Sequence, residues 1–447
     1  MNIIIAGDGE VGFHLAKMLS NNDHNITIVD PDQELIKMVE SQSEALAITG
    51  DSTSIEVLEQ AKVKKADLMI SVLHDERINI VTSVLAKKLG AKRCIARITN
   101  PEYLTPHNKQ IFKALGIDAI VSPESLAAKE IGKLLRNPAA TEIFDFSEGL
   151  LSLFLLKLDS KALILNKTLD NIAAENEHLD FRAIAIHRDS KTIIPRGNDQ
   201  FLENDMTYII TKPEGINEML RLGGKDDLHI NTVMIAGGGR IGKLTALLIE
   251  KEMAVKLIDN SLERCNKLAA ILTNTMIIHG DIRNLNLLEE EGIKQTDAFV
   301  AVTEQSETNI LSCLLAKKYG IKRTIALVEN IDYIDVSQRM GIDTIINKKL
   351  IAASYISRFT LRANVASIKC LHGVDAEVLE FIVKSDAWMA GKQIKDMEFP
   401  AGAIIGGIVR GQESFIALGN LVIHEGDKLV VFAIPSVIKK VEKIFSK

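Results

Sequence analysis

The sequence predicts an α/β protein in which two Rossmann-like, doubly wound parallel-sheet domains are each followed by a small α+β domain. Three observations support this fold class. A glycine-rich motif occurs twice, strand-like apolar runs alternate with amphipathic helices after each copy, and each half then changes to short strands and turns. The expected domains cover residues 1–139, 140–224, 230–363 and 364–447.

The two halves of the chain repeat each other. IIIAGDGEVG at residues 3–12 returns as VMIAGGGRIG at residues 233–242. The same offset relates AKKLGAKR at 86–93 to AKKYGIKR at 316–323, Asn79 to Asn309, and Gly50-Asp51 to Gly280-Asp281. Such self-similarity indicates an internal duplication. Two nucleotide-type motifs in one chain favour a binding or regulatory protein over a single-site enzyme.

The expected elements of the first half alternate between strand and helix. Strands are expected at residues 2–6, 25–30, 45–50, 68–73 and 94–98. Helices are expected at residues 11–19, from the second strand through 39, at 79–89 and at 124–136. Continuous apolar strands between amphipathic helices are typical of a buried parallel sheet. The same cycle restarts near residue 231.

The small domains read differently, as short strands separated by turn residues. Strands are expected at residues 151–158, 181–188 and 207–211, with turns at 195–198 and 203–205 between them. The second small domain repeats this pattern. FIALGN at 415–420 matches IIPRGN at 193–198, and HEGDKLVVF at 424–432 matches LENDMTYII at 202–210.

Composition excludes several classes of protein. The chain has 53 Lys and Arg against 59 Asp and Glu, so no global basic field would attract nucleic acid. The four cysteines form no CxxC pair, as is typical of a reducing compartment. The start MNIIIAG lacks the basic leader of a signal peptide, and no apolar run reaches the ~18 residues of a membrane span. We therefore expect a cytoplasmic protein that meets a membrane only through a partner.

Each glycine motif predicts a phosphate-binding turn. Its first glycine allows the tight turn from strand to helix, the second lets a diphosphate approach the backbone, and the third lets helix and strand pack closely. The free N–H groups and dipole of the following helix favour an anion. The expected binding residues are Gly7, Asp8, Gly9, Glu10, Val11 and Gly12 in the first half, and Gly237, Gly238, Gly239, Arg240, Ile241 and Gly242 in the second.

An acid ends the second strand of each half, Asp30 in the first and Asp259 in the second. An acid there, about 20 residues beyond the glycines, accepts hydrogen bonds from ribose hydroxyls and repels a 2′-phosphate. Both sites are therefore expected to prefer NAD(H) over NADP(H). Further candidates lie at the carboxyl ends of the other strands, where open α/β sheets bind ligands: Asp51, Leu73, His74 and Arg97, and Asp281, Thr303 and Glu304.

Two positions leave alternatives open. Arg240 occupies the place of Glu10, and it either reaches a phosphate or faces solvent. Arg97 either pairs with a phosphate or with a helix carboxylate, and because its counterpart is Leu327, its role belongs to the first half alone.

Residues for other chemistry are missing from the sequence. The ten histidines form no H-x-x-x-H or Cys/His cluster, so no metal site is expected. No G-x-S-x-G or P-loop motif occurs, and the small domains offer few proton donors of the kind a dehydrogenase needs. The loop residues His74, Asp75 and Glu76 are better explained as a solvated loop than as a catalytic group.

Across its whole length the chain resembles the RCK family of the Trk potassium-uptake type, with tandem TrkA-N and TrkA-C domains. The stretches that carry the resemblance are IAGDGEVG, ITIVD, INIVTSVLAKKLG, IARI, IAGGGRIG, VKLID, HGD, VAVTEQSETNILSCLLAKKYG, FPAGAIIGGIVRG and IHEGDKLVVF. The sequence departs from the family pattern at Glu10, at Leu73-His74 and at Leu327. These departures leave open whether both sites bind the same nucleotide.

The resemblance implies a non-enzymatic regulator, cytoplasmic and peripheral on the inner face of the membrane. It implies NAD(H) as ligand, with ATP and ADP as further candidates, and a homo-oligomeric ring of RCK domains. The ring would gate a transmembrane potassium translocation subunit of the Trk/Ktr type, and helices within 101–136 and 331–362 are candidates for domain pairing. The alternatives are an NAD-dependent oxidoreductase, which would change the nicotinamide absorbance during turnover, and a cytosolic nucleotide sensor with a soluble partner.

Overall fold

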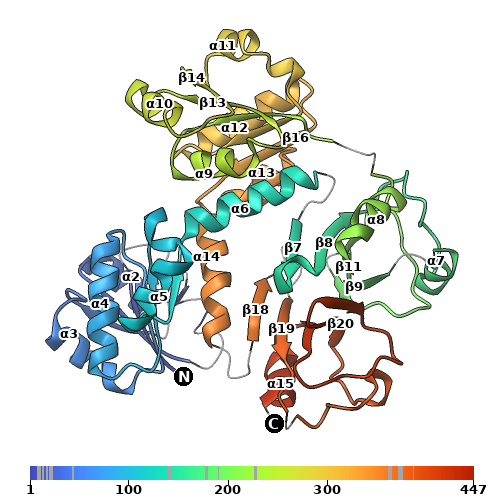
Figure 1. Ribbon diagram of the computed structural model, residues 1–447, viewed down its shortest axis with the longest axis horizontal. Helices are drawn as coiled ribbons and strands as arrows, with labels where there is room; N and C mark the ends of the chain where they lie inside the picture. Colours follow the sequence, from blue (N-terminus) through green and yellow to red (C-terminus); the bar gives the residue numbers. More distant parts are fainter. Residues whose placement is uncertain are drawn as a thin grey trace. The chain divides into compact units, whose positions relative to one another are not determined.

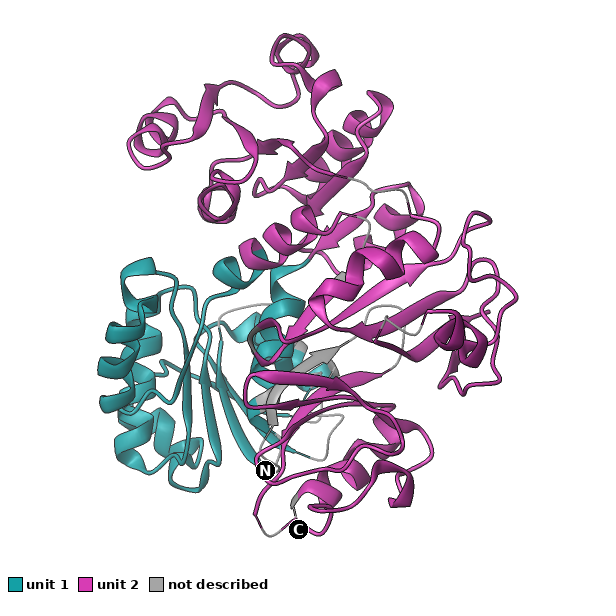
Figure 2. Ribbon diagram, turned by 45° about the vertical axis from the view of Figure 1, so that its right-hand side comes forward, with its two compact units in different colours: residues 1–127, 347–360 teal, residues 128–346, 361–447 magenta. Residues whose placement is uncertain are grey.

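The structure is a computed structural model of the full chain (Figure 1). It describes all residues except 8–11, 13–14, 17–18, 20–23, 43–44, 139–141, 177–179, 190, 226–228, 361–364, 371–375, 386 and 447. Two compact units are distinguished in Figure 2, one of residues 1–127 and 347–360, the other of residues 128–346 and 361–447. Most of the helix expected at 11–19 lies outside the described residues.

The first sheet has six parallel strands in the order β3-β2-β1-β4-β5-β6. Its strands are β1 (Asn2–Ala6), β2 (Asn25–Asp30), β3 (Leu46–Thr49), β4 (Leu68–Ser71), β5 (Cys94–Arg97) and β6 (Ala119–Val121). Its helices are α2 (Gln33–Gln42), α3 (Ile55–Gln60), α4 (Glu76–Leu89), α5 (Pro106–Ala114) and α6 (Pro123–Arg136). This is the predicted doubly wound topology, with β6, α3 and α5 added to the expected elements.

The second sheet repeats the first, in the order β14-β13-β12-β15-β16-β17. Its strands are β12 (Thr232–Ala236), β13 (Ala254–Asp259), β14 (Thr275–His279), β15 (Ala298–Ala301), β16 (Arg323–Leu327) and β17 (Thr344–Ile346). Its helices are α9 (Arg240–Ile249), α10 (Leu262–Ala269), α11 (Leu285–Glu290), α12 (Ser306–Lys318) and α13 (Asp332–Arg339); α14 (Lys348–Ser357) follows β17. The matching order of strands agrees with the duplication inferred from the sequence.

Two antiparallel sheets of five strands form the small domains, in the orders β10-β9-β11-β8-β7 and β18-β19-β22-β20-β21. The first contains β7 (Glu142–Phe146), β8 (Leu151–Lys157), β9 (Phe181–Arg188), β10 (Lys191–Ile193) and β11 (Met206–Thr211), with α7 (Leu169–Glu175) and α8 (Ile216–Leu222). The second contains β18 (Val365–Cys370), β19 (Glu377–Ile382), β20 (Ala403–Arg410), β21 (Glu413–Ile416) and β22 (Lys428–Ala433), with α15 (Pro435–Ser446). In the first small domain, the three strands expected from the sequence are β8, β9 and β11. The edge strands β7 and β10 complete its sheet.

The two small sheets share one hydrophobic core. Phe146, Tyr208 and Ile210 of the first belong to the same buried cluster as Val378 and Phe432 of the second. The sheets approach closely at β20 because it carries two successive glycines. A Cβ on Gly406 would lie 3.1 Å from the Ile184 side chain, and one on Gly407 would lie 2.6 Å from the Leu151 side chain.

An ion pair between a partly exposed arginine and a buried carboxylate recurs in each small domain. Arg188 of β9 donates two hydrogen bonds to Asp205 at 2.7 and 2.6 Å, and Arg410 of β20 donates two to Asp427 at 2.8 Å each. Both carboxylates are fully buried, so the repeated Asn-Asp and Gly-Asp turns are explained by this structural pairing.

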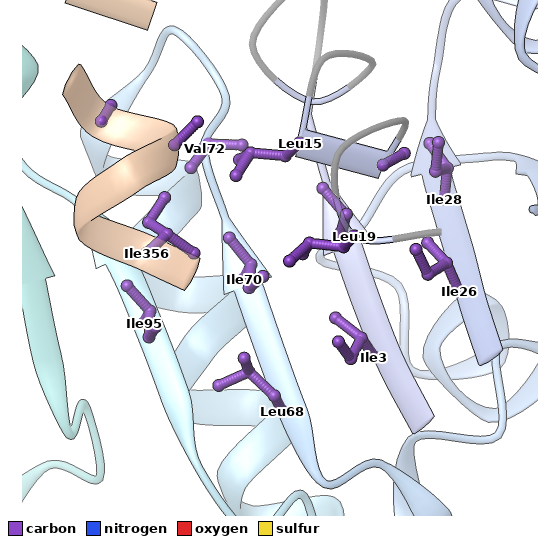
Figure 3. Packing of buried hydrophobic residues seen from close by; sticks show 14 of the residues in the cluster. Ile3, Leu15, Leu19, Ile26, Ile28, Leu68, Ile70, Val72, Ile95 and Ile356 are labelled. Carbon is purple, nitrogen blue, oxygen red and sulfur yellow. The ribbon is translucent and has the colours of Figure 1, made fainter. Parts of the chain in front are cut away.

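The helix α14 packs on the first sheet, although it follows the sixth strand of the second. Its buried residues Ala352, Ala353 and Ile356 lie in one cluster with residues of β1, β4 and β5, as Figure 3 shows for Ile356, Ile70 and Ile95. The C-terminal part of α6 contacts the second half instead, where Arg136 donates to Glu252 at 2.7 Å. Both helices lie in the segments expected to take part in domain pairing.

Over the part of the chain that the structure describes, no helix is long and apolar enough to cross a membrane.

Candidate nucleotide sites

A cavity of about 290 Å³ lies at the carboxyl ends of the strands in the second sheet. This is the edge where a doubly wound sheet binds its ligand. Its lining includes most of the residue positions expected from the sequence: Gly237, Gly239, Asp259, Asp281, Thr303 and Glu304, together with Ile258, Asn260, Arg264, Gly280, Ile282, Arg283, Val302, Gln305 and Thr308.

The three motif glycines of the second half serve different purposes. Gly237 has a φ of +110°, and a Cβ there would lie 2.9 Å from the carbonyl oxygen of Val302. A Cβ on Gly242 would lie 1.9 Å from the carbonyl oxygen of Gly237, so this glycine is required for helix and strand to pack. A Cβ on Gly239 would meet nothing within 4 Å. The space beside Gly239 is therefore open, and α9 begins at the next residue.

Asp259 is held by three donors at the end of β13. The backbone N–H of Gly238 donates to Oδ2 at 2.7 Å, that of Ser261 donates to Oδ1 at 2.8 Å, and Arg264 donates to Oδ2 at 3.0 Å. The carboxylate is 4% exposed, so these bonds fix its position beside the glycine loop. Sequence reasoning missed Arg264, whose counterpart five residues after Asp30 is Leu35.

A second arginine borders the same cavity. Arg283 pairs with Asp281 at 2.6 Å, and hydrogen bonds from its side chain and backbone hold the pKa of Asp281 below its usual value. Asp281 therefore stays ionised at neutral pH. The first half has Thr53 at this position, and its backbone N–H and hydroxyl donate to Asp51 at 2.8 Å.

Two buried asparagines tie the strand ends together. Asn309 accepts from the Thr303 backbone N–H at 2.9 Å and donates to the carbonyl oxygens of Thr303 and Leu327, at 3.0 and 2.8 Å. Asn79 makes the equivalent three bonds to Leu73 and Arg97, at 2.8, 2.8 and 3.0 Å. Their side chains fix the position of the loop after the fourth strand. Their recurrence at equal offset was the sequence signal for this role.

The first half places its described candidates at the equivalent edge. A Cβ on Gly7 would lie 3.0 Å from the Gly12 Cα, which shows the same close approach. Asp30 is fully buried at the end of β2, where its Oδ1 accepts from the Asp32 backbone N–H at 2.8 Å. His74 is exposed in the loop after β4. Asp8, Gly9, Glu10 and Val11 lie outside the described residues.

Arg97 pairs with a helix carboxylate, one of the two alternatives left open by the sequence. Its Nη2 lies 3.1 Å from Oε1 of Glu124, in the first turn of α6. Glu124 was missed because a contact between residues 27 apart depends on how the strands and helix fold. Among the described residues, no cluster of three His, Cys, Asp or Glu could hold a metal ion.

The repeated AKK segment has a structural role rather than a binding one. Lys87 donates to the Lys92 carbonyl oxygen and to Asp118, at 2.6 and 2.9 Å. In the second half, Lys317 donates to Asp343 at 2.6 Å. These bonds join the end of a helix to the strands beside it.

Comparison with known proteins identifies two domain types in this chain, each matched twice. The TrkA-N domain model matches residues 3–123 and 233–348, and the TrkA-C domain model matches 153–223 and 378–446. A Trk system potassium uptake protein TrkA homolog of Archaeoglobus fulgidus is 34% identical over 452 residues, covering all of both chains. The TrkA protein of Halomonas elongata is 31% identical over 450 residues, covering 100% of this chain and 98% of the relative.

Solved structures support the fold. The crystal structure of the GsuK RCK domain matches with a TM-score of 0.62 at 17% identity, covering 100% of this chain and 95% of that one. The GsuK channel bound to NAD matches with a TM-score of 0.64 at 17% identity, covering 100% and 79%. The relatives of Archaeoglobus fulgidus and Halomonas elongata are named as potassium uptake proteins and not as enzymes. With two TrkA-N and two TrkA-C domains matched along its length, this chain belongs to the TrkA family of Trk potassium uptake systems.

Proposed function

We propose that this chain is the peripheral regulatory subunit of a Trk-type potassium uptake system, acting on a transmembrane translocation subunit of the Trk/Ktr type from the cytoplasmic side. The observation that carries the proposal is the cavity beside Gly239, which joins a glycine turn, a helix N-terminus and a ribose-type acid in one site. The NAD-bound state of a channel with the same fold supports NAD(H) as its ligand.

The glycine loops would hold the diphosphate, and Asp30 and Asp259 would accept from the adenosine ribose. Asp51 and Asp281, after the third strands, would lie near the adenine. The other nucleotide of the ligand would contact the ends of the fourth and fifth strands. The residues there are Leu73, His74 and Arg97 in the first half, and Thr303 and Glu304 in the second. Ligands shift the assembly only through their different affinities for its conformations.

The direct test of the role is co-purification. Membranes that contain a Trk-type translocation subunit should retain this chain, and the amount retained should change when NADH is added. A chain that never associates with such membranes, or that oxidises NADH in the presence of alcohols, aldehydes or 2-hydroxy acids, would contradict the proposal.

Binding should favour NADH over NADPH. A 2′-phosphate loses the ribose contacts and meets a buried acid, at a cost of about 1–3 kcal/mol. Calorimetry on the full chain measures both affinities, and Asp30→Asn should reduce the preference. Equal or tighter binding of NADPH by the unmodified chain would refute this assignment.

ATP and ADP are proposed as further ligands, with the second site as the better acceptor. Arg264 and Arg283 line the second site, and Arg240 is the exposed first residue of α9, directly after Gly239. The first half has Leu35, Thr53 and Glu10 at these positions. A charge reversal at a few ångströms is worth on the order of 1–4 kcal/mol before solvent screening. Arg240→Glu should weaken ATP binding, and Glu10→Arg should strengthen it at the first site. Unchanged affinity in both variants would indicate that these side chains face solvent.

The same helices in both halves expose apolar side chains that could join copies into a ring. In the second half these are Leu311 of α12 and Val336 of α13, 65% and 56% exposed, with Met340 just beyond. In the first half, Val81 of α4 and Ile111 of α5 are exposed at 46% and 49%. Because the patches are related but different, pairing one with the other would build a head-to-tail ring.

The exposed apolar residues of α12 and α13 are therefore predicted to lie in the interface between copies of the chain. Val336→Asp together with Leu311→Asp should convert the native oligomer into smaller species on size-exclusion chromatography with light scattering. The matched control is Leu262→Asp, which changes an equally exposed leucine of α10. An oligomer that survives the double change would exclude α12 and α13 from the interface.

A further inference from the structure

The Arg97–Glu124 pair has unused hydrogen-bonding capacity. The two residues are 8% and 7% exposed, and only Nη2 of the arginine and Oε1 of the glutamate meet, at 3.1 Å. Nε of Arg97 and Oε2 of Glu124 are both buried and have no hydrogen-bond partner among the residues that the structure describes. A buried polar atom without a partner costs free energy, so a group that offers both an acceptor and a donor would be stabilised here.

The pair lies on the half of the sheet that receives the second nucleotide of a dinucleotide. Doubly wound sheets bind one nucleotide over β1–β3 and the other over β4–β6, across the point where strand order reverses. Arg97 ends β5, and Glu124 is the third residue after β6 ends at Val121. β5 and β6 are parallel neighbours, with Arg97 opposite Val121 in the register. In NAD(H), the nucleotide on this side carries nicotinamide.

The chemistry of the pair matches a primary carboxamide. The carboxamide oxygen accepts from Nε of an arginine, and its NH₂ donates to a carboxylate oxygen. A phosphate offers acceptors only, so it would satisfy Arg97 and be repelled by Glu124. The second half has Leu327 in place of Arg97, and Lys349 as the second residue of α14, where α6 has Glu124. The feature is therefore confined to the first half.

We propose that Arg97 and Glu124 form the recognition site for the nicotinamide carboxamide, which makes the first site selective for NAD(H) over nucleotides that lack nicotinamide. This inference rests on the proposed binding of NAD(H) at that site. Both unused atoms are buried, so the carboxamide reaches them by displacing the side chains that cover them. The second half, without the pair, would not distinguish NAD(H) from ADP-type ligands in this way.

The test removes the hydrogen-bond donor from the ligand and, in a separate variant, the matching acceptor from the protein. In 3-acetylpyridine adenine dinucleotide a methyl group replaces the carboxamide NH₂, so the donor for Glu124 is lost. The unmodified chain should bind this analogue about tenfold more weakly than NAD⁺ at one of its two sites, the loss expected for one buried hydrogen bond. Glu124→Gln keeps the shape of the side chain and its hydrogen bond to Arg97 but replaces the acceptor Oε2 by an NH₂ group. In this variant the ratio of the NAD⁺ affinity to the analogue affinity should be close to one.

Two controls separate the possible outcomes. ADP-ribose lacks nicotinamide, so its affinity should be the same in the unmodified chain and in Glu124→Gln; a parallel loss would mean that the pair acts on the ribose or on the fold, and would overturn the inference. The double variant Arg97→Leu with Glu124→Lys installs the residues of the second half and should also abolish the preference for NAD⁺. If neither variant changes the ratio of the NAD⁺ affinity to the analogue affinity, the carboxamide site is refuted. Absence of any NAD⁺ binding to the unmodified chain would instead refute the proposed function.

Discussion

Gly239→Ala is expected to abolish nucleotide binding at the second site while leaving the fold unchanged. The backbone at Gly239, with φ −63° and ψ −170°, is accessible to alanine, and the added Cβ would meet no atom within 4 Å. The space beside this glycine is where a diphosphate would approach the backbone, so the methyl group would displace the ligand. We expect affinity at this site to fall about 100-fold or more, measured by calorimetry with NADH, at an unchanged melting temperature.

Gly242→Ala is the matched control, because it should act on the fold first. Its Cβ would lie 1.9 Å from the carbonyl oxygen of Gly237, so strand and helix would have to separate. Overpacking of this kind costs about 1–3 kcal/mol, and the melting temperature should fall. If Gly239→Ala binds NADH as tightly as the unmodified chain, the diphosphate does not lie at this loop.

Asn309→Leu is expected to produce the largest loss of stability in the second half. The side chain is fully buried, and its removal leaves the Thr303 N–H and the carbonyl oxygens of Thr303 and Leu327 without their partner. Each unsatisfied buried group costs about 1–3 kcal/mol, so the three together should cost at least about 3 kcal/mol. The loop that carries Thr303 and Glu304 should also lose its position in the nucleotide cavity.

Hydrogen exchange is the appropriate measurement, because it reports the stability of each sheet separately. Amides of β15 and β16 should exchange faster in Asn309→Leu, while those of the first sheet should be unaffected. Asn79→Leu should instead speed up exchange in the first sheet and leave β15 and β16 unaffected. Asn286→Leu, at an exposed position of α11, should change exchange in neither sheet. Unchanged exchange at β15 would mean that the amide is dispensable.

The sequence predicted the elements whose signal is local. Five strands of the first sheet and three of the first small domain are found where apolar runs and turn residues placed them, for example Asn25–Asp30 and Phe181–Arg188. The strands β6, β7 and β10 were missed. β6 and β10 have only three residues each, and β7 is an edge strand with Glu142 and Asp145 in it, so none of them shows a distinct apolar run.

The same distinction holds for the candidate site. The positions of the glycine turns and of Asp30 and Asp259 at the strand ends were predictable, because they depend on spacing along one strand–turn–helix segment. Arg264 lies only five residues beyond Asp259, but its contact depends on how α10 packs beside β13, which periodicity does not reveal.

What the sequence by itself determined is the duplication, the doubly wound sheets and the two glycine loops, because each is specified by residues close together in the chain. Only the tertiary structure decided which distant residues meet. It placed Glu124 against Arg97, packed α14 on the first sheet and joined the two small sheets at Gly406. The physical reason is that these contacts close long loops, and their free energy comes from burial and hydrogen bonds that exist only once the sheets have formed.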